Sequence, residues 1–190
     1  MVWLCGLAGI SGGTLTVVLA VLTASKPRGC IGDECAVRTM REAGVLDAVL
    51  FLLAGSFVAA ALAGLVVRAG RTGRFGRAGR AGLAAVAAGA ALVATGMMLD
   101  VWNSELVPAF IIPGLLAVIA GFLLLGVAVL RAGVPPRRRG VLVIAGVLAM
   151  LGFNDQNWQV LMAVPFGVAW VAVGYALWSS EPAQRPARVR

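Results

Sequence analysis

The stretch Arg68-Ala-Gly-Arg-Thr-Gly-Arg-Phe-Gly-Arg-Ala-Gly-Arg80 has arginine at every third position, with a glycine before each later arginine. Long apolar runs flank it on both sides. Short loops rich in Lys and Arg stay on the cytoplasmic side of a membrane. We therefore expect residues 68–80 to form a cytoplasmic loop, and its position orients every other segment.

The remaining sequence has the composition of a membrane protein. Of its 190 residues, 61% are hydrophobic and 13% are charged, and the mean hydropathy is +0.95. Soluble domains contain about 45–50% apolar and about 25% charged residues. Several apolar runs approach the ~20 residues that a helix needs to cross a bilayer. The composition therefore argues against a soluble domain.

The order of these runs predicts an all-α, polytopic integral membrane protein: one domain, residues 1–180, with six transmembrane helices and a basic cytoplasmic tail, residues 181–190. Both termini are expected in the cytoplasm. The predicted spans are residues 2–24, 45–67, 81–99, 109–130, 140–156 and 160–178. The alanine-rich span 81–99 has smooth sides, which suit the middle of a bundle.

The fifth span is too short to cross a bilayer by its apolar part alone. Residues 140–153 would form a helix of about 21 Å, against a hydrocarbon core of ~30 Å. Either the bilayer thins there, or the helix continues into the polar residues that follow. In the second case those polar side chains would line a wet cavity on the outer side.

The charges divide unequally between the two sides of this topology. Twelve of the sixteen Lys and Arg residues lie inside, together with one of the eight acids. This division explains the net charge of +8 without a nucleic-acid partner. The arginines of the opening stretch are expected to contact anionic lipid headgroups. They are Arg68, Arg71, Arg74, Arg77 and Arg80.

Two cysteines, Cys30 and Cys35, fall in the connection 25–44, which is extracytoplasmic in this topology. Thiols oxidise in that compartment, and Gly32 permits a tight turn between them. We expect a structural disulfide. A redox-active pair is the alternative, although membrane thiol oxidoreductases use a closer C-x-x-C pair that exchanges with a second pair. Cys5, the remaining thiol, is expected to pack as a small apolar residue.

Polar residues at the predicted outer ends form the best candidate binding site. Carboxylates and amides that converge there would bind a cation or a small polar solute. The candidate residues are Asp47, Asp100, Glu105, Asn154, Asp155 and Gln159. The alternative is an ordinary outer loop in which Asp47 pairs with Arg38 or Arg41.

The sequence leaves three classes of function open. The first is an accessory or structural membrane component without catalytic activity, which binds another membrane protein or its own copies through small-residue helix faces. The second is a small transporter or channel, and the third is a membrane thiol-disulfide oxidoreductase. No histidine and no phosphate-binding loop are present, so no catalytic residue, cofactor or metal is expected. The bias toward arginine over lysine suggests a GC-rich bacterial genome. The predicted location is the plasma membrane, as a multi-pass protein.

Overall fold

All secondary structure in the described part of the chain is helical. The computed structural model describes residues 2–30, 35–37, 39, 41, 44–71, 76–100, 105–132 and 137–179. Its elements are α1 (Val2–Ala24), α2 (Val45–Arg71), α3 (Gly76–Asp100), α4 (Val107–Ala132), α5 (Arg137–Ala149), the 3₁₀ helices η2 (Met150–Gly152) and η3 (Trp158–Met162), and α6 (Ala163–Ser179). Helices α1 to α4 and the continuous stretch Trp158–Ser179 are long and apolar enough to span a membrane. The predicted all-α, membrane-type fold is confirmed.

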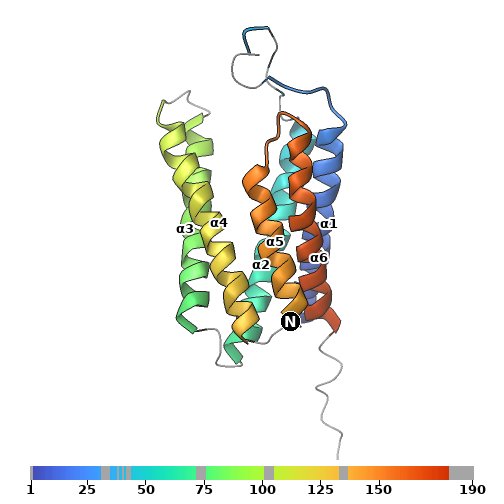
Figure 1. Cartoon of the computed structure of the whole chain (residues 1–190), viewed down its shortest axis with the longest axis vertical. Helices are drawn as coiled ribbons and strands as arrows, with labels where there is room; N and C mark the ends of the chain where they lie inside the picture. Colours follow the sequence, from blue (N-terminus) through green and yellow to red (C-terminus); the bar gives the residue numbers. More distant parts are fainter. Residues whose placement is uncertain are drawn as a thin grey trace, which may run out of the picture.

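The helices run alongside one another between two ends (Figure 1). One end, called here the arginine end, holds the starts of α1, α3 and α5 and the ends of α2, α4 and α6. The opposite end, called the clasp end, holds the end of α1, the start of α2, the end of α3, the start of α4 and the α5–α6 connection. The first helix therefore begins where the last one ends, as the predicted topology requires.

The arginine stretch is more helical than its glycines suggest. Helix α2 continues through Arg71, and α3 already begins at Gly76, whose φ is 60°. The expectation of a loop over residues 68–80 is corrected on this point. Adding one residue to an existing helix forms one hydrogen bond per residue, and arginine is a good helix former. Arg74 lies outside the described residues.

Helix α3 does not lie in the middle of the bundle, contrary to the expectation from its alanines. It packs along α4, and the two form a hairpin at one side of the molecule (Figure 1). Helix α4 joins this hairpin to the other helices by packing on α5. Helices α1, α2, α5 and α6 form the rest of the molecule. Within this group α1 packs closely on α2 and α6, and α5 packs on α6.

The same glycine arrangement joins α1 to α6 and α3 to α4. In each antiparallel pair, glycines spaced seven residues apart on one helix face glycines of equal spacing on the other. The facing pairs are Gly6 with Gly174, Gly13 with Gly167, Gly82 with Gly121, and Gly89 with Gly114. A seven-residue spacing returns to the same helix face, and small residues let backbones approach closely. These glycines bring the backbones of α1 and α6, and of α3 and α4, into direct contact.

Aromatic and aliphatic side chains fill the space between α2, α4, α5 and α6. Trp170 is 2% exposed, and its ring lies 5.9 Å from that of Phe122 and 6.2 Å from that of Phe166, centroid to centroid. Aromatic pairs favour such edge-to-face contacts. On the other side of α2, Cys5 packs against Gly64, as expected for a small apolar residue. Among the described residues the core is therefore apolar apart from the buried indole N–H of Trp170, and the polar contacts described between different elements lie at the clasp end.

Candidate functional site

The candidate site at the clasp end exists because α5 stops early. Its last turn tightens into η2, and Phe153 is extended, with φ −68° and ψ 132°. The α5 and η2 segments together rise about 25 Å, so the chain needs several further residues to reach the end of the bundle. Figure 1 shows this non-helical segment climbing beside α6. The helix therefore does not continue into the polar run, and the predicted span 140–156 ends as a helix at Gly152.

Cys30 and Cys35 form a disulfide, as expected from their spacing. The S–S distance is 2.04 Å, and the two Cα atoms lie 4.9 Å apart. Cys30 is 1% exposed, whereas Cys35 lies on the exposed side of the loop. One end of the small disulfide loop is thus anchored against the bundle and the other faces outward.

Gln156 is the centre of the polar contacts at this end. Its carbonyl accepts from the Gly29 N–H at 2.8 Å, and its Oε1 accepts from the Arg41 N–H at 2.6 Å. Its own N–H donates to Asn154 Oδ1 at 2.9 Å, and its Nε2 donates to Asp155 Oδ1 at 3.1 Å. The backbone and side chain of one residue therefore join the α5–α6 connection to both flanks of the disulfide loop.

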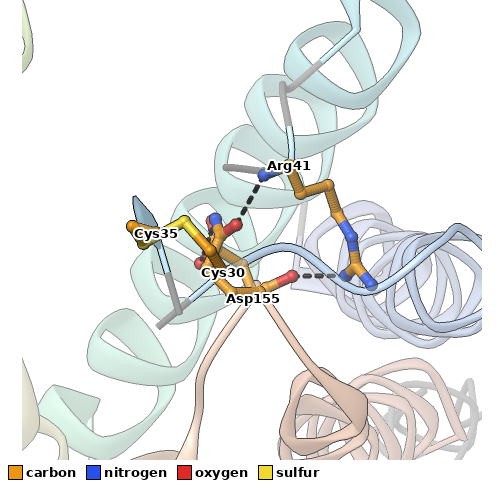
Figure 2. Close-up of a disulfide and its surroundings, with 5 residues drawn as sticks. Cys30, Cys35, Arg41 and Asp155 are labelled. Carbon is orange, nitrogen blue, oxygen red and sulfur yellow. Dashed lines mark hydrogen bonds between the residues drawn. A yellow bond between two sulfur atoms is a disulfide. The ribbon is translucent and has the colours of Figure 1, made fainter. Parts of the chain in front are cut away.

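Arg41 completes the contact between the two connections. Its Nε donates to the Pro27 carbonyl at 3.0 Å, and its Nη2 is 3.3 Å from the Lys26 carbonyl. Figure 2 shows the guanidinium reaching the backbone carbonyl of Asp155 beside the disulfide. Arginine can do this because its fork presents several donors in fixed directions. We call Lys26, Gly29, Arg41, Asp47 and Gln156, with the disulfide, the clasp.

Asp47 connects the clasp to α2. It forms an ion pair with Lys26, and its Oδ2 also accepts from the Gly44 N–H at 2.8 Å. The anticipated partner was Arg38 or Arg41, so the partner is corrected to Lys26. Arg38 lies outside the described residues, and Arg41 uses its guanidinium on backbone carbonyls instead. The pair joins the end of α1 to the beginning of α2.

The structure brings four of the six candidate residues to the same part of the clasp end. Asp47, Asn154 and Asp155 belong to or contact the clasp, and Gln159 follows in η3, where it bonds Asn157. Glu105 is exposed in the connection at the tip of the α3–α4 hairpin, on the other side of the molecule (Figure 1). Asp100 ends α3, and its side chain lies outside the described residues.

These placements determine what the site can do chemically. Lys26 neutralises Asp47, while Asn154 and Gln159 bond within their own turns. Within the described ranges, no group of three His, Cys, Asp or Glu residues converges as metal ligands would. The contacts hold two connections together, and binding of a cation or solute here stays a prediction.

Of the five arginines expected to contact lipid, Arg77 and Arg80 are exposed in the first turns of α3. Arg68 lies in the last turns of α2, and the side chains of Arg71 and Arg74 lie outside the described residues. Contact with lipid headgroups is not tested by these positions.

Sequence reasoning missed the roles of Gln156, Arg41 and Lys26. Gln156 belongs to the polar run, but nothing in the sequence distinguished it from its polar neighbours. Arg41 was expected to pair with a carboxylate rather than to donate to backbone carbonyls. Comparisons with protein families, curated proteins and solved structures found no match to this chain. The assignment of function therefore relies on the geometry.

Proposed function

We propose that this chain is an accessory membrane protein, without catalytic activity of its own, that binds a transmembrane helix of another protein along α3. The observation that carries the proposal is the exposed face of α3, opposite α4. That face is formed by small residues over most of the length of the helix. They are Ala84, Ala87, Ala88, Ala91, Ala94 and Thr95.

Other exposed faces of the molecule are bulkier, as expected for contact with lipid. Helix α2 exposes Leu52 at 66%, and α4 exposes Leu116 at 60% and Ile112 at 58%. Lipid chains adapt to such side chains, whereas small residues on a helix allow another helix to approach closely. The alanine face of α3 is therefore better suited to a helix than to lipid.

Helix α1 provides an internal comparison. Its Gly6 and Gly13 face α6, its Gly12 faces α2, and its Gly9 lies between Gly174 of α6 and Ala61 of α2, so both of its small-residue faces are covered. Helix α3 repeats the first arrangement with α4, but its second small-residue face is open. We propose that the partner helix packs on the second face of α3 in the way that α2 packs on the second face of α1.

The charge at the arginine end favours a different protein over a second copy. Arg77 and Arg80 lie on the same face as the alanines, two turns and one turn before Ala84, respectively. Two copies packed through α3 in one membrane would bring these arginines together, which is unfavourable. A helix with a carboxylate at its cytoplasmic end would instead pair with them. We also propose that the arginines without a protein partner contact anionic headgroups, at about 1 kcal/mol each.

A photoreactive amino acid at Ala88 should cross-link to one membrane protein in cells, and Ala84→Leu with Ala91→Leu should abolish that adduct. Leucine on this open face would block the partner while changing the stability of the isolated protein by less than about 0.5 kcal/mol. The adduct is read by mass spectrometry. The same probe at Leu116, which is expected to face lipid, is the control; lipid adducts alone at both positions would refute the proposal.

We propose six crossings of a bacterial plasma membrane with both termini in the cytoplasm. In a Cys5→Ala background, Thr72→Cys should then escape a membrane-impermeant maleimide in intact cells and react after permeabilisation. Glu105→Cys, at the opposite end, should react in intact cells. The readout is a mass shift on a gel. Labelling of Thr72→Cys but not Glu105→Cys before permeabilisation would reverse the topology.

The two alternatives have less support from the geometry. A thiol oxidoreductase normally exchanges its disulfide with a second pair, but Cys5 lies at the arginine end, packed on Gly64. A transporter would use the clasp-end carboxylates, of which Asp47 is already paired with Lys26. Binding of a partner helix to the exposed alanine face of α3 therefore has the most support of the three functions.

A further inference from the structure

The position of the disulfide suggests a role beyond holding a small loop. Cys30 directly follows Gly29, which donates to the Gln156 carbonyl at 2.8 Å. Arg41, which donates to Gln156 Oε1 at 2.6 Å, follows Cys35 by six residues. Both flanks of the disulfide therefore hold the same residue of the α5–α6 connection.

The disulfide shortens the chain path between these two flanks. Without it, Gly29 and Arg41 are joined only through the chain between them; with it, the bond between Cys30 and Cys35 provides a shorter covalent path. Cross-links that pre-order a loop in its bound conformation strengthen the contact that the loop makes. Cleavage of the bond should consequently weaken the hold on Gln156 in particular.

The main contacts between helices inside the bundle lie away from this bond. Helix α1 contacts α6 through Gly6 and Gly13, which lie well away from the clasp end, and α5 contacts α6 through Gly146. Opening the clasp would therefore free the connections at one end and leave the helix packing in place. A local change of this kind can act as a switch.

We propose that the Cys30–Cys35 bond is a redox-sensitive latch, opened by a dithiol in the extracytoplasmic space. One thiolate of the dithiol attacks Sγ of exposed Cys35, and the Cys30 sulfur leaves as a thiolate and is protonated. The second thiol of the reductant resolves the mixed disulfide. Two electrons pass to the protein, which gains two thiols, and the dithiol becomes a disulfide. The latch does not depend on whether α3 binds a partner.

The test compares amide hydrogen exchange in the full-length protein, in lipid nanodiscs, before and after treatment with dithiothreitol. Reduction should occur without denaturant and should speed exchange at the Gly29 and Arg41 amides at least tenfold. The amides of α1 and α6 should keep their protection. The Cys30→Ser, Cys35→Ser double variant should show the fast exchange from the start and should not respond to dithiothreitol.

Three results would overturn the latch. Equal exchange at Gly29 and Arg41 in the oxidised and reduced protein would make the bond a passive cross-link. Resistance to dithiothreitol until denaturant is added would show that Cys35 is not open to attack. Loss of protection throughout α1 and α6 on reduction would show that the bond supports the whole fold rather than one end of it.

Discussion

Gly174→Ala should destabilise the protein by about 2–3 kcal/mol, whereas the same change at Gly55 should stabilise it by up to about 1 kcal/mol. A Cβ on Gly174 would lie 2.5 Å from the Ile10 nitrogen and 2.6 Å from the Gly6 oxygen. Both are backbone atoms, so no side-chain rotation relieves the overlap and the helices must move apart. A Cβ on Gly55 meets nothing within 4 Å, so only the better helix propensity of alanine remains.

Reversible denaturation in detergent, followed by circular dichroism, measures both changes on one scale. The pair is well matched because each is a glycine-to-alanine change inside a long helix. A third variant tests whether Gly174 acts through Gly6. Gly6→Ala added to Gly174→Ala should cost less than it costs alone, because the first change has already separated α1 from α6. Equal effects of alanine at Gly174 and Gly55, or full additivity of the pair, would contradict the close contact.

The sequence predicts the helices well because their signal is local. An apolar run of sufficient length must satisfy its backbone as a helix, so the first span, residues 2–24, has the bounds of α1 (Val2–Ala24). The close spacing of Cys30 and Cys35 likewise made their disulfide predictable. Small residues showed that helices would approach one another, but not which ones. The small alanines of α3 also led to the wrong prediction that this helix lies in the middle of the bundle. An alanine face suits the interior of a bundle as well as an exposed surface that binds a partner.

The clasp was beyond the reach of sequence reasoning because its contacts join distant parts of the chain. Arg41 and Gln156 are 115 residues apart, and the Arg41 N–H that meets Gln156 Oε1 is a backbone group with no side-chain signature. The sequence showed the polar run and the short fifth span. It did not show that the early end of α5 leaves the backbone of residues 155 and 156 available to another connection.

Gln156→Ala should consequently destabilise the protein by about 2 kcal/mol, a larger effect than any other single substitution of a polar side chain in the α5–α6 connection. The change removes Oε1, so the Arg41 N–H loses its acceptor, and it removes the Nε2 bond to Asp155. Gln159→Ala is the matched control. Within the described part of the chain the Gln159 side chain bonds only Asn157, so its loss should cost less than about 0.5 kcal/mol.

The variant Gln156→Glu distinguishes the loss of the Oε1 acceptor from the other effects of shortening the side chain to alanine. A glutamate keeps an oxygen for the Arg41 N–H and carries a charge that the nearby guanidinium favours, but it loses the Nε2 donor and lies beside Asp155. It should therefore be less destabilising than Gln156→Ala, in denaturation and in exchange at the Arg41 amide. If alanine and glutamate destabilise equally, the bond from the Arg41 N–H contributes little, and the loss of the Nε2 bond to Asp155 accounts for the effect. If Gln159→Ala costs as much as Gln156→Ala, the polar run stabilises this end as a whole, and Gln156 has no special position in it.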